Sequence, residues 1–260
     1  MQYQSGRPIN DWRALANPYK EGDDRHPRLG HPTGVVDTAG TLHVFVRNAG
    51  RGLHLRHEDK DGKWHPWKDL RGSALHEGAT AGVTSKGRIG VLAPSDKPLH
   101  HWQQSVCGGE FERLEDVHVT MVPGSGVALE TSGDQLTYYV KDASSSGLLA
   151  IRPDGSLVQI GGAPAGGAPS ALRTLIDGQD CTILTHRGLA DSPIFGAFVT
   201  NTEELGVQWA EVGHPCLGDP ALVLDAHGRI TLAMIAADGS PHITRQSSSS
   251  GLTLGQWHRL

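Results

Sequence analysis

Apolar and polar residues alternate in five short segments that align with one another without gaps. The segments are DTAGTLHVFV from Asp37, TSKGRIGVLA from Thr84, TSGDQLTYYV from Thr131, IDGQDCTILT from Ile176 and DAHGRITLAM from Asp225. Their starts are 47, 47, 45 and 49 residues apart. Each segment opens with residues that favour tight turns and continues with small or apolar residues at most alternate positions. The pattern predicts a repeated β-hairpin whose second strand buries one face.

Two further strands are expected in each repeat. The alternating strand is followed by GLHLRH, PLHHWQ, GLLAIR, PIFGAF or PHITRQ, and then by WKDL from Trp67, FERL from Phe111, LVQI from Leu157, WAEV from Trp209 or WHRL from Trp257. Four short antiparallel strands at a period in the forties are typical of propeller blades. A generic β-sandwich would not repeat its strands in register five times. We therefore predict an all-β fold, a five-bladed β-propeller with four-stranded antiparallel blades.

The repeat predicts one propeller domain over residues 1–260, with blades at about 31–72, 78–116, 120–162, 168–213 and 218–260. The segment WRAL at Trp12 looks like a sixth copy of the fourth strand, so an extra N-terminal strand is expected within residues 9–30. This strand either adds to a blade edge or completes the last blade while the C-terminal strand lies elsewhere. The long charged connection Asn17–Gly30 is either a lid or a solvated excursion.

The first repeat, DTAGTLHVFVRNAGRGLHLRHE followed by KWHPWKDLRG, resembles propeller lectins of the tachylectin type and the bacterial fucose-binding propellers. The resemblance extends from about His31 to Leu260 and implies sugar sites between blades, with Trp64, Trp67, Trp102 and Trp209 as aromatic platforms. The sequence departs from that family because its polar and aromatic positions do not repeat. The middle of the third strand, for example, holds Leu55, His101, Ala150, Gly196 and Thr244. This divergence favours one asymmetric site over five equivalent ones.

Charge and composition exclude several classes of partner. A formal net charge of −5 gives no basic surface for nucleic acid or an anionic membrane. No apolar run is long enough to span a bilayer and no leader sequence is apparent, so a cytoplasmic location is expected. The three cysteines lack zinc spacing, and the sequence contains no HExxH or GxGxxG motif. We therefore expect neither a metal nor a cofactor.

The polar residues that should surround one mouth of the central channel are the candidate site. The predicted catalytic residues are His31, Glu77, His118 and Asp219, each expected just before an inner strand. The predicted ligand-binding residues are Arg47, Lys97 and Arg187 from the second-to-third strand connections, and Tyr19 and His26 from the N-terminal loop. Neutral imidazoles beside carboxylates can act as acid and base near neutral pH. Such a mouth suits a small-molecule ligand, polyketide-like or sugar.

Two main functions follow from these features. The first is a cofactor-independent enzyme of the cyclase or isomerase type, acting on one natural-product substrate in the central channel. The alternative is a carbohydrate-binding propeller lectin without catalysis. Two lesser alternatives are a protein-interaction propeller and a glycoside hydrolase using the carboxylates of Asp37, Glu130 and Asp225.

Overall fold

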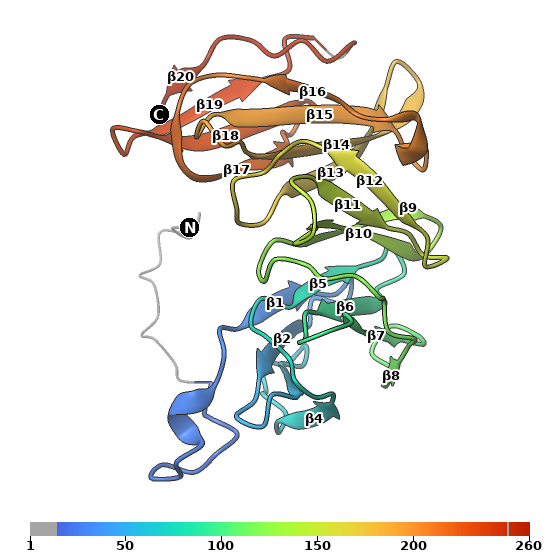
Figure 1. Ribbon diagram of the computed structural model, residues 1–260, viewed down its shortest axis with the longest axis vertical. Helices are drawn as coiled ribbons and strands as arrows, with labels where there is room; N and C mark the ends of the chain where they lie inside the picture. Colours follow the sequence, from blue (N-terminus) through green and yellow to red (C-terminus); the bar gives the residue numbers. More distant parts are fainter. Residues whose placement is uncertain (1–14, 249) are drawn as a thin grey trace.

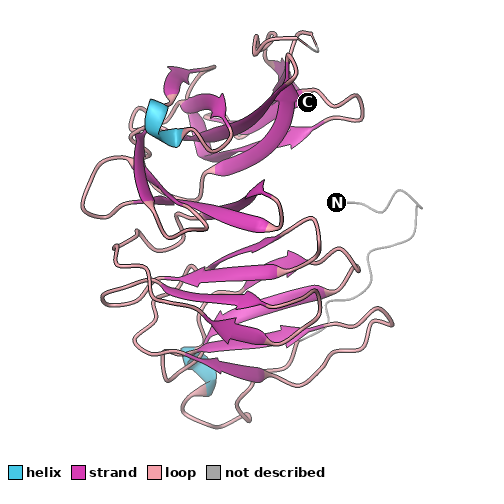
Figure 2. Ribbon diagram, turned by 90° about the vertical axis from the view of Figure 1, so that its right-hand side faces the viewer, coloured by secondary structure: helices cyan, strands magenta, loops and turns pink. Residues whose placement is uncertain are grey.

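The computed structural model describes residues 15–248 and 250–260. Within these residues the chain forms five four-stranded antiparallel sheets in sequence order, and each sheet keeps its strands in the order of the chain. The helical content is limited to two 3-10 turns, η1 (His26–Arg28) and η2 (Glu203–Leu205). The predicted all-β, five-bladed propeller is therefore confirmed (Figures 1 and 2).

The strands of each blade run from an inner first strand to an outer fourth strand. Blade one holds β1 (Thr33–Val36), β2 (Leu42–Arg47), β3 (Leu53–His57) and β4 (Lys68–Arg71). Blade two holds β5 (Thr80–Val83), β6 (Ile89–Ala93), β7 (His100–Gln104) and β8 (Phe111–Arg113), and blade three holds β9 (Val127–Ser132), β10 (Gln135–Lys141), β11 (Leu148–Ile151) and β12 (Leu157–Gly161). Blade four holds β13 (Ser170–Ile176), β14 (Gln179–Arg187), β15 (Pro193–Val199) and β16 (Gln208–Glu211). Blade five holds β17 (Cys216–Leu224), β18 (Ile230–Ala236), β19 (Pro241–Arg245) and β20 (His258–Arg259).

The turn between the first and second strands follows the chemistry expected from the sequence. In blade one, Asp37 Oδ1 accepts hydrogen bonds from the backbone N–H groups of Ala39 and Thr41, both at 2.9 Å. Asp225 makes the same pair of bonds in blade five. A glycine completes each turn at positive φ, 83° at Gly40 and 72° at Gly228, where other residues would be strained. These turns fix the register of the alternating strand.

The hydrophobic core consists of four clusters, one at each junction between successive blades. Alternate residues of a second strand face opposite neighbours, so both faces of an inner blade are buried. In blade two, Val91 packs with Phe45 of blade one, whereas Leu92 packs with Tyr138 of blade three. Gly90 allows this close approach, because a Cβ atom there would lie 2.4 Å from the Tyr138 hydroxyl oxygen. The blades are thus held together by apolar packing rather than by strand pairing.

Tryptophan side chains seal the outer part of two junctions. The indole N–H of Trp102 donates to the carbonyl of Leu70 at 3.0 Å, and that of Trp209 donates to Ile160 at 2.7 Å. Because Trp102 is 1 % exposed, its expected role as a sugar platform is wrong. The indole fills the junction and satisfies its only donor there, which leaves no face for a ligand.

The first described strand, β1, and the last, β20, lie in different blades. β20 pairs with β19, so the last blade takes its fourth strand from the C-terminal segment, and the arrangement with that strand elsewhere is wrong. Trp12 lies outside the described residues, and residues 15–30 of the range in which the N-terminal strand was expected form turns and η1 instead of a strand. Figure 1 shows the first and last sheets at opposite ends of the longest axis. No helix in the described part of the chain is long and apolar enough to cross a membrane.

Candidate functional site between the blades

Two pockets of ligand size lie between neighbouring blades. The first inter-blade pocket, between blades one and two, has a volume of about 250 Å³ and is lined by Asp37, Thr41, His43, Leu55, His57, Asp59, Lys68, Gln104, Gly108, Gly109, Glu110 and Phe111. The second inter-blade pocket, between blades two and three, has a volume of about 490 Å³. Residues of the second pocket include His101, Glu115, His118, Tyr138, Arg152 and Asp154. The two pockets are lined by different sets of side chains, so they are not equivalent binding sites.

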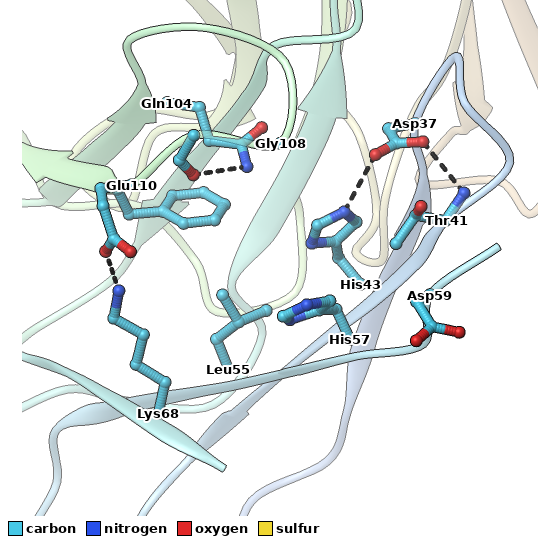
Figure 3. Close-up of a pocket in the computed structure, with 12 residues that line it drawn as sticks. Asp37, Thr41, His43, Leu55, His57, Asp59, Lys68, Gln104, Gly108 and Glu110 are labelled. Atoms are coloured by element: carbon cyan, nitrogen blue, oxygen red, sulfur yellow. Dashed lines mark hydrogen bonds and ion pairs between the residues drawn. The ribbon is translucent and has the colours of Figure 1, made fainter. Parts of the chain in front are cut away.

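The walls of the first inter-blade pocket come from opposite blades. β2 and β3 supply one wall, and the loop between β7 and β8 supplies the other. Gln104 holds that loop, because its amide N–H donates to the Gly109 carbonyl at 3.0 Å while its amide oxygen accepts from the Ile89 N–H at 3.1 Å. Lys68 and Glu110 form an ion pair across the junction. Figure 3 shows this pair on one side and Asp37, Thr41 and His43 on the other.

Three imidazole rings stack along blade one. The ring centroids of His43 and His57 are 5.5 Å apart, and those of His57 and His65 are 4.3 Å apart, with planes within 20° and 14° of parallel. A carboxylate binds each end of the stack, since His43 Nε2 lies 3.2 Å from Asp37 Oδ2 and His65 Nε2 lies 3.4 Å from Asp59 Oδ2. Two of these rings, His43 and His57, line the pocket and give it flat, polarizable surface.

Burial keeps the two pocket imidazoles neutral near pH 7. Desolvation lowers the pKa of His43, outweighing the opposing effect of the Asp37 carboxylate. Desolvation also lowers the pKa of His57, helped by the neighbouring His65 and His43 rings. Each neutral ring carries one N–H donor and one acceptor nitrogen. The pocket therefore combines neutral donors and acceptors with the charged Lys68, Asp59 and Glu110.

The second inter-blade pocket has both apolar and titratable side chains in its lining. Its floor holds Tyr138, whose hydroxyl lies 3.4 Å from His101 Nε2, with the two rings edge to face at 5.4 Å. Burial lowers the pKa of His101 to about 4, so this ring is neutral at physiological pH. Arg152 lines the rim but is already engaged by Glu203 and Glu204. This leaves the carboxylates of Glu115 and Asp154 to give the pocket an acidic rim.

Three of the sequence-predicted site residues do come together. Glu77 Oε1 accepts a hydrogen bond from Arg47 at 3.2 Å, and Glu77 Oε2 pairs with His31. Hydrogen bonds from His31 and then Arg47 lower the pKa of Glu77, so its carboxyl stays ionised. The space between them is only about 10 Å³, room for no more than about one water. This cluster ties blade one to blade two.

The remaining predicted residues fall into separate places. Lys97 and His118 line an open hollow beside Asp96, and His118 also reaches the second inter-blade pocket. Arg187 pairs with Asp191. Asp219 lies inside β17 instead of before it, at an irregularity in register between Leu217 and Ala221 that lengthens the strand. Burial raises the pKa of Asp219, with Arg187 opposing.

The described part of the N-terminal loop packs on blade one. The Tyr19 hydroxyl accepts a hydrogen bond from the Ala49 N–H at 3.2 Å, and the Arg25 guanidinium lies 4.6 Å from the centre of the Tyr19 ring. The His26 carbonyl accepts from the Asn17 side chain at 2.9 Å. Neither Tyr19 nor His26 lines an inter-blade pocket. The expected ring of nine residues around one mouth is thus distributed over several small clusters.

Sequence reasoning missed the first inter-blade pocket. His43 and His57 are direct cross-strand partners of β2 and β3, and pairing the strands of the hairpin would have brought them together. Asp37, considered only as a hydrolase carboxylate, does line the pocket, whereas Glu130 and Asp225 hold turns in blades three and five. These three carboxylates do not converge. Among the described residues no group of three or more histidine, cysteine or acidic side chains is arranged to hold a metal ion.

Comparisons with known proteins identify the fold and leave the family open. No protein-family model and no curated protein matches the chain. Among solved structures, AofleA from Arthrobotrys oligospora has a TM-score of 0.61 at 10 % identity, covering 88 % of this chain and 71 % of that one. The Aleuria aurantia lectin in complex with alpha-methyl-L-fucoside has a TM-score of 0.56 at 14 % identity, covering 88 % and 77 %. An alpha-L-arabinofuranosidase from Fusarium graminearum has a TM-score of 0.55 at 12 % identity, covering 91 % and 82 %. The chain is thus similar in fold to a lectin and to a glycosidase, and the first of these likenesses agrees with the lectin resemblance of the repeat.

Proposed function

We propose that this protein is a carbohydrate-binding propeller that holds one sugar unit in the first inter-blade pocket. The observation that carries the proposal is the lining of that pocket, which combines flat neutral rings with an ammonium, carboxylates and an amide. Sugars present a ring of hydroxyl groups around an apolar face, and such a mixture matches both features. The likeness of the fold to a lectin seen with a fucoside supports the same ligand class.

The size of the pocket supports a small ligand. Pockets for drug-sized ligands are usually about 300–1,000 Å³, so a volume of about 250 Å³ suits a single monosaccharide unit. The polar side chains are placed at opposite walls, which lets them contact different hydroxyl groups of one ring (Figure 3). The comparisons favour this carbohydrate alternative over a cofactor-independent cyclase or isomerase.

A glycan array followed by calorimetry tests the proposal. Lys68→Ala and Glu110→Gln remove the ion pair at the pocket wall and should weaken the selected glycan at least about tenfold. Glu112→Gln is the matched control, because Glu112 is exposed on β8 next to the pocket and does not line it. The proposal fails when no glycan binds, or when both pocket variants bind as tightly as the control.

Turnover must be measured on the same glycan. Two of the comparable folds are glycosidases by name, the arabinofuranosidase and a sialidase. Nuclear magnetic resonance of the bound glycan over one day would show cleavage or isomerisation directly. We expect the glycan to remain unchanged, because all three pocket carboxylates are already engaged. Asp37 binds a turn and His43, Asp59 binds a turn and His65, and Glu110 pairs with Lys68.

A further inference from the structure

The second inter-blade pocket is formed by two stretches of chain from neighbouring blades. Blade two supplies His101 on β7 and the start of the β8–β9 loop, residues 114–118, whereas blade three supplies residues of β10, β11, the β11–β12 turn and β12. The volume of about 490 Å³ falls within the range of about 300–1,000 Å³ that is usual for small-molecule sites. This pocket is therefore large enough for a ligand of its own.

Each of the two stretches exposes a leucine at the pocket. Leu114, directly after β8, is 37 % exposed, and Leu157, the first residue of β12, is 45 % exposed. A ligand whose apolar part covers these side chains removes them from water, which is the main driving force for binding small molecules. The lining therefore favours a ligand with an apolar body.

Two carboxylates, which together form the acidic rim of the pocket, lie beside these leucines in the sequence. Glu115 follows Leu114 directly and is exposed. Asp154 lies in the β11–β12 turn, where its Oδ1 accepts hydrogen bonds from the Ser156 N–H at 2.9 Å and the Ser156 hydroxyl at 2.7 Å. These bonds lower the pKa of Asp154, so its carboxyl is ionised at neutral pH. Both bonds use Oδ1, so Oδ2 can accept from a ligand.

The other charged groups at the pocket do not cancel the acidic rim. Asp116 pairs with Arg113 at 2.5 Å, which makes that pair neutral. Arg152 also lines the pocket, but its guanidinium pairs with both Glu203 and Glu204, so this group has more negative than positive charge. The pocket therefore combines apolar walls with an excess of negative charge.

We propose that the second inter-blade pocket binds a small amphipathic amine, whose ammonium group is held by the acidic rim and whose apolar body covers the two leucines. An ammonium group only donates hydrogen bonds and an ionised carboxylate only accepts them, so the two are complementary. A neutral hydroxyl group would gain less at the same position, and an anion would be repelled. This site is separate from the first inter-blade pocket and does not depend on the proposed carbohydrate function.

A ligand series tests the charge and the apolar body separately. Phenethylamine and tryptamine are the probes, phenethyl alcohol and tryptophol are their neutral counterparts, hydrocinnamate is an anion, and butylamine is an amine with little apolar surface. We expect at least one of the two probes to bind, its alcohol and butylamine to bind at least about tenfold more weakly, and the anion not to bind. Titrations followed by nuclear magnetic resonance of leucine methyl groups provide the affinities. The shifts should be largest for Leu114 and Leu157, whose signals are identified by their loss in Leu114→Val and Leu157→Val.

Side-chain changes test the acidic rim directly. Glu115→Gln and Asp154→Asn remove the charges and keep the size of each side chain, and asparagine can still accept the Ser156 bonds through its carbonyl oxygen. We expect each change to weaken binding of the amine about two- to fivefold, and the double variant to weaken it about tenfold. Glu112→Gln is the matched control, because it removes an exposed carboxylate of β8 that does not line the pocket. Raising sodium chloride from about 0.02 M to about 0.3 M should weaken binding to the wild type more than binding to the double variant.

Three outcomes would overturn the proposal. The first is that neither probe binds, and the second is that an amine and its alcohol bind equally well. The third is that Glu112→Gln weakens binding as much as the double variant does, which would show attraction by the overall charge of the protein instead of by the acidic rim. A glycan that shifts the signals of the same two leucines would assign the pocket to sugar and would also overturn it. Because glycan binding is measured separately at the first inter-blade pocket, failure of the amine leaves the proposed function unaffected.

Discussion

A buried ion pair between blades three and four provides a quantitative test of how the blades are joined. Glu203, in η2 on the loop between β15 and β16, is 0 % exposed and accepts from Arg152 Nε at 2.9 Å. The hydroxyl of Tyr139, on β10, donates to the other carboxylate oxygen at 3.0 Å. Burial, reinforced by Glu203, raises the pKa of Tyr139, so the hydroxyl stays protonated as a donor. One carboxylate thus binds the buried Tyr139 hydroxyl and the partly exposed Arg152 guanidinium of the neighbouring blade.

Removing this carboxylate should be costly. Glu203→Ala leaves the buried Tyr139 hydroxyl without its acceptor, which costs about 1–3 kcal/mol, whereas Arg152 is partly exposed and keeps Glu204 as a partner. At about 2–4 °C per kcal/mol for a chain of this size, Glu203→Ala should lower Tm by about 2–12 °C. Glu204→Ala is the matched control, since Glu204 pairs with the same arginine but is 55 % exposed and should cost less than about 1 kcal/mol.

Thermal and urea unfolding of Glu203→Ala, Glu204→Ala, Arg152→Ala and Arg152→Ala/Glu203→Ala provide the measurement. The double variant should lose less stability than the sum of Arg152→Ala and Glu203→Ala, because the buried Glu203 carboxylate is then no longer left without its arginine. Equal, small losses for Glu203→Ala and Glu204→Ala would refute the reasoning. They would show that the buried pair contributes no more than a surface one.

Three further predictions follow from the same structure. Gly162→Ala should destabilise the protein, because the φ angle of Gly162 is 88° and a Cβ atom there would lie 2.7 Å from His186 Nε2 and 2.9 Å from Trp209. Calorimetry should show a lower Tm for this variant, and an unchanged Tm would contradict the packing. Because the pKa of His101 is lowered to about 4 in the folded state, protonation favours unfolding, so stability should fall as pH drops from about 6.5 to 4, by at most about 1.4 kcal/mol per pH unit. His101→Gln should flatten that slope in urea titrations at several pH values, and an equally steep slope would exclude His101 as its source. Alanine at His31, Glu77, His118 or Asp219 should change glycan affinity less than about twofold, because none of these side chains lines the first inter-blade pocket. A large loss of affinity in calorimetry would instead indicate a site at the predicted mouth of the central channel.

The fold was predictable because its determinants repeat. The turn residues (aspartate in blades one and five), the alternating apolar residues and the glycines of the turns recur at nearly constant spacing, and each acts within a single hairpin. The register of β2 against β3 and β18 against β19 depends on neighbours only a few residues away. Such local determinants are visible in the sequence of one chain.

The site was much less predictable because it is formed between blades. Gln104 and Glu110 contribute to a pocket whose other wall begins at Asp37, and no local pattern shows that the β7–β8 loop folds toward blade one. The side chains of His31 and Glu77 are in direct contact, and the sequence could not show that Glu77 also binds Arg47 through its other carboxylate oxygen. Their side chains satisfy one another and leave no room for a ligand.

Divergence of the polar positions has a structural consequence at each junction. Residue 101 is a histidine that faces Tyr138 in the second inter-blade pocket, and the corresponding Leu55 of blade one supplies apolar lining to the first. The next position holds Arg56 in blade one, facing Trp64 and Trp67, and Trp102 in blade two, buried against Leu70. The first of these positions therefore lines a pocket in both blades, whereas the second binds an aromatic surface in blade one and fills a junction in blade two. For this reason a repeated scaffold gives pockets of different chemistry, and a ligand selected by one pocket should not bind at the next.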